Sequence, residues 1–170
     1  MTRDELLRQL EVLHPDCFGW ALSCCDGDRE EAEDVLHTAY TTILDGRAQF
    51  NGRSSSRTWL LGVIRMTARA HRRRRMLRWL RWERPLGSTD SADPSPDPAA
   101  AAEGADEKAQ LTGALAKLPG RQRELLHLVF YQELSISEAA DVLAISIGTA
   151  RTHYERGKQR LRELLGAHRP

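Results

Sequence analysis

A stretch rich in proline, alanine, serine and aspartate divides the chain and limits what it can fold into. It spans residues 86–104, with proline at every second position near its centre. Proline has no backbone N–H to donate and interrupts helices and sheets, and this composition is typical of a flexible tether. We therefore expect two small domains, residues 1–84 and 106–170, joined by a flexible acidic linker over residues 85–105.

Both halves fit helices rather than strands. Apolar residues recur at spacings of three and four, as one face of an amphipathic helix requires, and no alternating run is long enough to predict a strand. In the first half the pattern predicts helices over residues 6–20, 32–43 and 59–82. In the second half, apolar segments flank Pro119 and are followed by two further helices. The expected fold class is all-α.

Charge is strongly segregated along the first half. The whole chain has a formal net charge of only +1, but residues 47–82 contain eleven arginines and no acid, whereas residues 1–46 contain eleven acids and three arginines. Like charges at this density repel one another unless an anionic partner lies against them. The block therefore favours nucleic-acid binding over a face that is merely solvated.

The last two predicted helices have the spacing of a helix-turn-helix. Ala140, Ala144 and Ala150 fall where small residues let two short helices cross around a tight turn, and Ser135 and Glu138 fit a capping box before the first of them. Hydrogen-bond donors on the second helix indicate a face that reads the major groove; the alternative is an ordinary solvated helix face. The candidate DNA contacts are Ser146, Thr149, Arg151, Thr152, His153, Arg156 and Lys158.

Several motifs occur in the order found in a known family. They are EAEDV at residues 31–35, RTWL at 57–60, LPGRQRELL at 118–126, EAA at 138–140 and IGTART at 147–152. Together they resemble the extracytoplasmic-function (ECF) group of bacterial RNA polymerase sigma factors, and two motif sets in the right order are more specific than either alone. The resemblance implies a non-enzymatic protein that binds core RNA polymerase, directs promoter-specific transcription initiation and is regulated by an anti-sigma factor.

The resemblance also assigns roles to the two domains. The second would recognise the minus-thirty-five promoter element through its helix-turn-helix. The first would bind the clamp helices of the largest polymerase subunit, and the candidate contact residues are Asp34, Val35, His37, Thr38 and Tyr40. The alternative is that the acidic residues of this predicted helix are only solvated, while Val35 and Tyr40 belong to the core. The first domain would also capture the minus-ten element, with candidates Phe50, Asn51, Ser54, Ser55, Ser56, Trp59, Arg65, Arg69, Arg72, Arg73, Arg74 and Arg75, although Trp59 by itself fits core packing.

Five residues depart from the family pattern, among them His37 and Thr38, where relatives usually have glutamine and aspartate. Met66 stands where relatives commonly have asparagine, Ala70 where they have aspartate, and His153 where they often have arginine. A neutral imidazole carries no fixed positive charge, so His153 is expected to shift base preference. The electrostatic contribution of the arginine block does not depend on these positions.

The competing hypothesis is a stand-alone helix-turn-helix regulator acting as a homodimer. The arginine block would make a poor dimer interface, which disfavours it. An enzyme is disfavoured because no paired carboxylates in a metal motif, phosphate-binding glycine loop or organised nucleophile and base occur, and no cofactor or metal is expected. Cys17, Cys24 and Cys25 suggest reduced, buried thiols, with a redox or metal-sensing role left open. No apolar run predicts a membrane span or signal segment, so the cytoplasm is the expected location.

Overall fold

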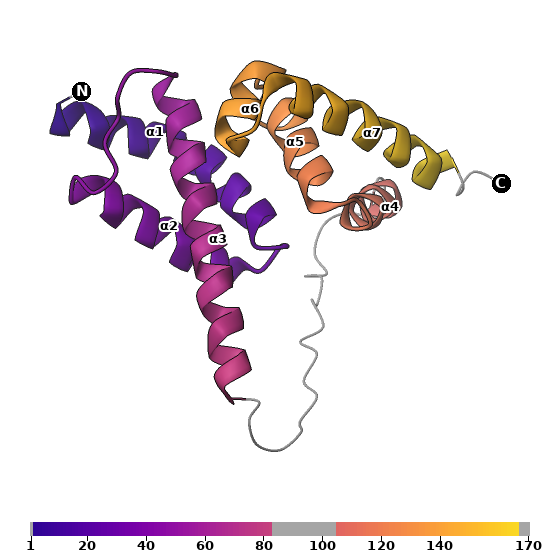
Figure 1. Cartoon of the computed structure of the whole chain (residues 1–170), viewed down its shortest axis with the longest axis horizontal. Helices are drawn as coiled ribbons and strands as arrows, with labels where there is room; N and C mark the ends of the chain where they lie inside the picture. The colour runs from indigo at the N-terminus through magenta and orange to yellow at the C-terminus, as the bar shows by residue number, and fades with distance from the viewer. Residues whose placement is uncertain (1, 83–104, 167–170) are drawn as a thin grey trace. The chain divides into compact units, whose positions relative to one another are not determined.

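The computed structural model describes residues 2–82 and 105–166, and the chain divides into two compact units (Figure 1). Within these residues every regular element is a helix, so the all-α prediction is confirmed. The first unit contains α1 (Arg3–Cys24), α2 (Arg29–Leu44) and α3 (Ser56–Trp82), and the second contains α4 (Ala105–Ala116), α5 (Gly120–Phe130), α6 (Ile136–Leu143) and α7 (Ile147–Gly166). Residues 85–104 of the predicted linker lie outside the described residues, and its last residue, Ala105, begins α4.

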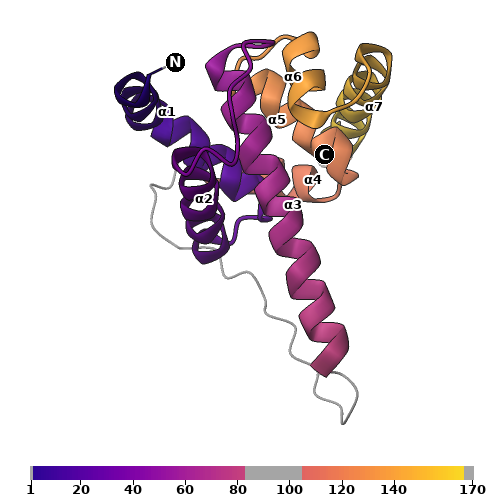
Figure 2. The ribbon, with the colours of Figure 1, turned by 60° about the vertical axis from the view of Figure 1, so that its left-hand side comes forward.

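The first unit is a three-helix domain built around Trp20. This side chain is fully buried, as are Val35 on α2 and Ile64 on α3. The Trp20 indole Nε1–H donates to the carbonyl oxygen of Leu61 at 3.0 Å, which satisfies the polar atom that burial would otherwise leave without a partner. Figures 1 and 2 show α1 and α2 beside one half of α3, while its C-terminal half extends beyond them.

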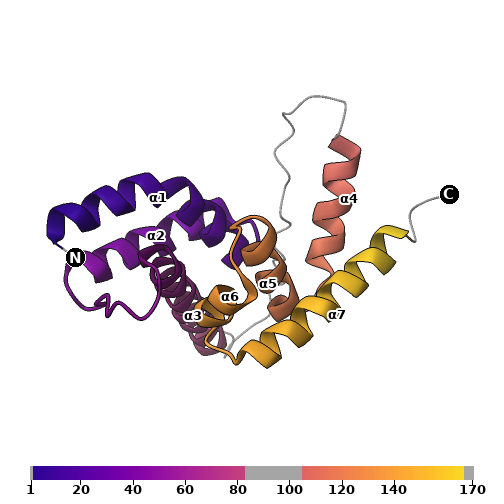
Figure 3. The same ribbon diagram turned by 90° about the horizontal axis from the view of Figure 1, so that it is seen from above.

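The second unit contains the predicted helix-turn-helix. Ser135 and Glu138 form the predicted capping box at the start of α6. Ala144 ends α6 in the left-handed conformation, with φ of 52°, and this turns the chain into α7. Ala140 and Ala150 are buried, as the predicted spacing requires for a close crossing of α6 and α7. Seen from above in Figure 3, α7 is the long helix of this unit and α4 packs against it.

The three cysteines are free thiols, and Cys17 and Cys25 are buried. Burial raises the pKa of the Cys17 thiol to about 11 and that of Cys25 to about 12, so both are protonated and unreactive near neutral pH. No group of three or more metal-ligating side chains occurs within the described residues. None of the helices in the described part of the chain is long and apolar enough to cross a membrane.

Candidate nucleic-acid interface

The hydroxyl groups predicted to contact DNA form local hydrogen bonds at the start of α7. Ser146 Oγ accepts from the Thr149 backbone N–H at 3.1 Å and lies 2.8 Å from Thr149 Oγ1. Thr152 Oγ1 donates to the Gly148 carbonyl at 3.1 Å. Ser146 therefore caps the helix, which satisfies an N–H group that would otherwise lack a partner. These side chains lie on the exposed surface of the helix-turn-helix but are held by local bonds.

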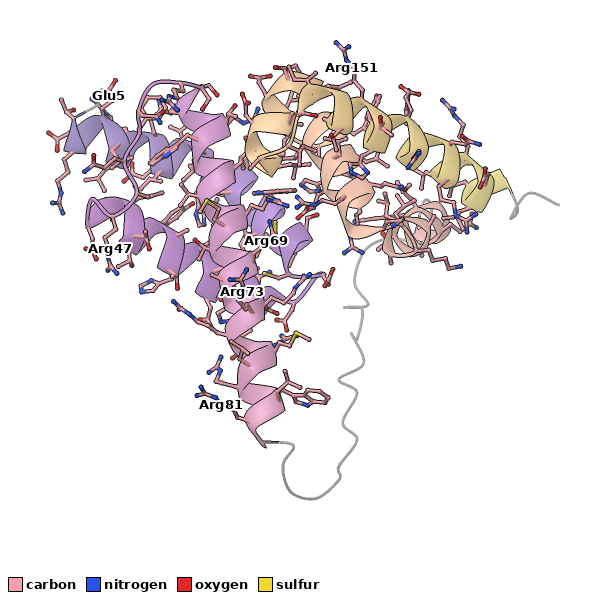
Figure 4. The ribbon with its side chains drawn as sticks, viewed as in Figure 1. Glu5, Arg47, Arg69, Arg73, Arg81 and Arg151 are labelled. Atoms are coloured by element: carbon pink, nitrogen blue, oxygen red, sulfur yellow. The ribbon has the colours of Figure 1, made fainter. Side chains whose placement is uncertain are left out.

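Two arginines on α7 are the cations best placed to meet a ligand. Arg151 and Arg156 are exposed, and neither has an ion pair or hydrogen bond within the described residues. Figure 4 shows Arg151 pointing away from the second unit. Lys158 instead pairs with Glu155 at 3.0 Å and lies 4.4 Å from the centre of the Tyr154 ring, while His153 is half-buried with its Nδ1 turned inward.

The arginines of the block in the first unit fall into two groups, those with acidic partners and those without. Arg72 donates to Asp26 at 3.0 Å and to the Cys24 carbonyl at 2.8 Å, at the C-terminal end of α1. Arg75 donates to Glu31 on α2 at 2.7 Å. The acids of the first half thus neutralise part of the block, and these two arginines hold α3 against α1 and α2.

Other arginines of the block have no acidic partner. Arg69, Arg73 and Arg74 are exposed and form no ion pair or hydrogen bond with another residue in the part of the chain that the structure describes. Figure 4 shows Arg69, Arg73 and Arg81 following one another along α3. Arg65 corrects the sequence-based list: it is only 3% exposed, because its position on α3 faces the interior, so it is not part of this surface.

The loop before α3 is shaped by its own polar side chains. Asn51 Oδ1 accepts from the Arg53 backbone N–H at 3.1 Å, and Ser55 Oγ accepts from the Thr58 N–H at 3.0 Å and so caps α3. Phe50 and Trp59 meet edge to face with ring centres 5.5 Å apart. Both rings are half-buried, so Trp59 contributes to packing while part of it remains at the surface. Ser54 is half-buried in the same loop, and Ser56 donates to Gln9 on α1 at 3.2 Å.

The residues predicted to contact polymerase do not share one face. Val35 is fully buried in the helical core, so it is a packing residue, and the contact prediction for it is corrected. Asp34 and His37 are exposed, and His37 lines a groove between α1 and α2 together with Tyr40. Tyr40 lies 3.2 Å from His14 across this groove. Burial is the main cause that raises the pKa of Tyr40, so its hydroxyl stays protonated at neutral pH.

Thr38 faces a second groove, between α2 and α3. Met66, Ala70 and Arg74 line its α3 side, and Arg47, three residues after the last residue of α2, also lines it. Sequence reasoning assigned Thr38 to the polymerase surface and did not single out Arg47. Arg47 is the first arginine of the block and directly follows Gly46, and this position is the sequence feature by which it could have been singled out.

Comparison with known proteins agrees with the two-domain organisation. Residues 10–78 match the family Sigma-70 region 2, and residues 114–163 match Sigma-70, region 4. The chain is 30% identical over 142 residues to ECF RNA polymerase sigma factor SigX of Bacillus subtilis, covering 80% of this chain and 71% of that protein. It is 29% identical over 144 residues to ECF RNA polymerase sigma factor SigC of Mycobacterium tuberculosis, covering 84% and 74% of the two chains.

Solved structures share the fold. The sigma factor RpoE in complex with the anti-sigma factor NepR from Bartonella quintana matches with a TM-score of 0.75 at 22% identity, covering 97% of this chain and 99% of that one. The structure of CnrH in complex with the cytosolic domain of CnrY matches with a TM-score of 0.66 at 21% identity, covering 98% and 92%. With both sigma regions present in order and a relative at 30% identity over most of its length, the chain belongs to the ECF RNA polymerase sigma factors, which are non-enzymatic transcription initiation factors.

Proposed function

We propose that the first domain, residues 1–84, binds core RNA polymerase and the minus-ten element, and that the second, residues 106–170, binds the minus-thirty-five element. The observation that carries this assignment is the presence of two separately folded helical units that each expose arginines without acidic partners within the described residues. Two weak sites on one chain bind much more tightly when polymerase holds both at the correct separation.

At the minus-thirty-five element, α7 lies in the major groove with Arg151 and Arg156 as its principal contacts. Both side chains are exposed and unengaged within the described residues, and arginine binds guanine edges or phosphates with several donors at once. Ser146, Thr149 and Thr152 fix the start of the helix and offer hydroxyl oxygens to the same groove. His153 and Lys158 lie at the edges of this surface.

At the minus-ten element, the loop of residues 50–56 holds an unstacked base and α3 holds the strand. Arg69, Arg73 and Arg74 supply the phosphate contacts, because Arg72 and Arg75 are already paired with Asp26 and Glu31. Phe50 and Trp59, which are both half-buried, supply an aromatic surface in and after this loop.

Polymerase binds the first domain along α2. The exposed Asp34 and His37, with Tyr40 in the adjoining groove, form the proposed contact for the clamp helices of the largest subunit. An anti-sigma factor regulates the protein, in line with the complexes reported for the two structural neighbours. Because its targets are polymerase and chromosomal DNA, the proposed place of action is the cytoplasm.

The test is transcription by purified protein with core polymerase from a genomic fragment library. The expected result is a discrete set of transcripts that requires both the protein and polymerase. The proposal is wrong if no promoter-directed transcript forms while the protein alone, as a stable homodimer, binds a palindromic operator tightly. Sedimentation of the free protein separates these outcomes, because the proposal requires no dimer.

A further inference from the structure

The C-terminal end of α3 exposes a cluster of large apolar side chains that the proposed DNA contacts do not use. Four of the five residues from 76 to 80 are apolar and more than half exposed: Met76 at 63%, Leu77 at 53%, Trp79 at 60% and Leu80 at 51%. Figure 2 shows this end of α3 extending beyond α1 and α2. Single exposed apolar residues need no explanation, but a cluster of this kind indicates an interaction surface.

These four side chains share one face of the helix end. At about 100° of rotation per residue they cover an arc of about 160°, in the order Trp79, Met76, Leu80 and Leu77. Arg72 and Arg73 occupy the same side of α3 one turn earlier, so the apolar face is short and begins at Met76. Trp82 is exposed and lies one turn after Trp79, at the edge of this face.

Arginines occupy the opposite side of the same segment. Arg74, Arg78 and Arg81 fall within about 60° of one another, and their centre lies about 150° from the centre of the apolar face. All three are exposed and form no ion pair or hydrogen bond with another of the residues that the structure describes. Figure 4 shows Arg81 at the end of α3. Because residues 47–82 contain no acid, the segment itself supplies no charge to balance them.

We propose that residues 74–82 of α3 bind the surface of a membrane that contains anionic phospholipids. The apolar face lies at the boundary between headgroups and acyl chains, and Arg74, Arg78 and Arg81 pair with lipid phosphates. Helices that lie in the membrane interface combine these features, with arginine on the polar face and tryptophan and leucine on the other. The contact is peripheral, through one helix end.

The chemistry of the side chains favours this occupant. Tryptophan is enriched at the boundary between headgroups and acyl chains, because its ring is apolar while its N–H can donate a hydrogen bond. An arginine side chain is long enough to reach a phosphate while its helix lies lower in the interface. A bilayer is broad and nearly flat, so it can reach only a segment that projects from the fold, as this end of α3 does (Figure 2).

Three other occupants explain the segment less well. A nucleic-acid strand accounts for the arginines and can stack bases on Trp79, but it leaves Met76 and the two leucines in water. A second copy of this chain would bring two sets of uncompensated arginines together. A protein partner would need an apolar groove with an acidic rim shaped to a short helix end, whereas an anionic bilayer offers both without such a fit.

The test is flotation of the full chain with lipid vesicles. The probe vesicles contain phosphatidylglycerol and phosphatidylethanolamine in equal amounts, and the control vesicles contain only phosphatidylcholine, which has no net charge. We expect binding to the anionic vesicles to be at least about tenfold tighter, and to weaken as the salt concentration rises.

Paired variants separate the apolar face from the charges. W79Q/L80Q changes only exposed side chains and keeps every arginine, so it should retain the fold and weaken binding to anionic vesicles about tenfold or more. Val12→Gln on α1, which is 77% exposed, is the matched control and should bind as the wild type does. R78Q/R81Q should reduce the preference for anionic over phosphatidylcholine vesicles.

Tryptophan fluorescence shows whether the apolar face enters the bilayer. Bromine on the acyl chains of the anionic vesicles quenches a tryptophan that lies among them, so part of the wild-type fluorescence should be lost. W79F/W82F keeps an apolar face and should still float with the vesicles, but its quenching should disappear. The remaining tryptophans are Trp20, which is fully buried, and Trp59, which is half-buried.

The inference is overturned if anionic vesicles bind no more tightly than phosphatidylcholine vesicles, or if W79Q/L80Q floats as well as the wild type. Flotation without quenching by brominated acyl chains would also overturn it, because the arginines alone would then account for the attraction. If W79Q/L80Q weakens binding of a single-stranded oligonucleotide while no vesicle is bound, the occupant is nucleic acid and the inference is wrong. Transcription with core polymerase is a separate measurement, because the membrane contact does not depend on the proposed function.

Discussion

Arg75 on α3 donates a hydrogen bond of 2.7 Å to Glu31 on α2, and the other carboxylate oxygen of Glu31 lies 3.2 Å from Nδ1 of His71. The Glu31 side chain is only 9% exposed, whereas Arg75 is largely in solvent. One acid at the start of α2 thus ties down two residues of the cationic helix. These contacts of Glu31 explain how the arginine block of α3 can pack against the other helices of its domain before any nucleic acid is present.

Replacing Glu31 with glutamine should destabilise the first domain by about 1–2 kcal/mol, because a nearly buried carboxylate with two partners is lost. Urea unfolding followed by tryptophan fluorescence measures this, since all four tryptophans lie in residues 1–82. Glu33→Gln is the matched control: its ion pair with Arg29 is exposed, so its expected effect is below about 0.5 kcal/mol. Equal effects of the two variants would contradict the structural role of Glu31.

Arg74 and Arg72 should separate DNA binding from stability. Arg74→Ala removes an unengaged cation and should reduce the salt dependence of promoter binding by polymerase with this protein by about one phosphate contact, without changing stability. Arg72→Ala removes the bonds to Asp26 and the Cys24 carbonyl, so it should cost up to about 1 kcal/mol of stability and leave the salt dependence unchanged. Filter binding over a salt series and urea unfolding give the two readouts, and the reverse pattern would refute the division of the block.

The Trp20 indole should matter for its hydrogen bond as well as its volume. Trp20→Phe removes the buried donor to the Leu61 carbonyl and leaves a space in the core, so we expect a loss of about 2 kcal/mol in the free energy of unfolding. Trp79→Phe is the control, because Trp79 is exposed and its replacement should be close to neutral. Urea unfolding followed by far-ultraviolet circular dichroism measures both, and similar losses for the two variants would be inconsistent with the core placed around Trp20.

Local sequence patterns predicted the fold because each of them has a physical cause that involves only residues close together in the sequence. The capping box at Ser135 and Glu138 needs only two side chains three residues apart, and the packing of Ala140 and Ala150 needs only small volume at a fixed spacing. The third helix was also predicted to continue through the arginines, since arginine is a good helix former and no proline interrupts it before Trp82. Such features depend on residues that are near one another in the sequence, so a single sequence is enough to recognise them.

Pairing between helices could not be predicted in the same way. Whether an arginine of the block meets an acid depends on the rotation of α3 against α1 and α2, and that rotation brings Arg72 to Asp26 and Arg75 to Glu31 but leaves Arg74 in the groove with Thr38. The same rotation buries Arg65, which the sequence grouped with the exposed arginines. All of these residues are arginines from the same stretch of sequence, so only the packed structure distinguishes the paired and buried ones from the exposed ones.

Acidification should weaken the second domain through His127. Burial lowers the pKa of this imidazole from its ordinary 6.5 to about 4, and its ring stacks on Tyr131 with centres 5.1 Å apart. Above pH 6.5 neither the folded nor the unfolded state binds a proton at this side chain. Between pH 6.5 and 4 only the unfolded state takes up the proton, so the free energy of unfolding falls, by an amount on the order of 3 kcal/mol at the acid end.

His127→Gln tests this, because glutamine stays neutral at every pH and should flatten that part of the stability curve. Hydrogen exchange of the α5 amides, measured from pH 7 to pH 4 and corrected for the intrinsic exchange rate, confines the readout to the second domain. His37→Gln, an exposed imidazole in the first domain, should leave the exchange of α5 unchanged. Parallel curves for the wild type and His127→Gln would show that protonation of this imidazole does not control the acid stability of the helix-turn-helix domain. A curve that flattens only with His127→Gln would show that it does, whatever constant offset in stability the substitution itself brings.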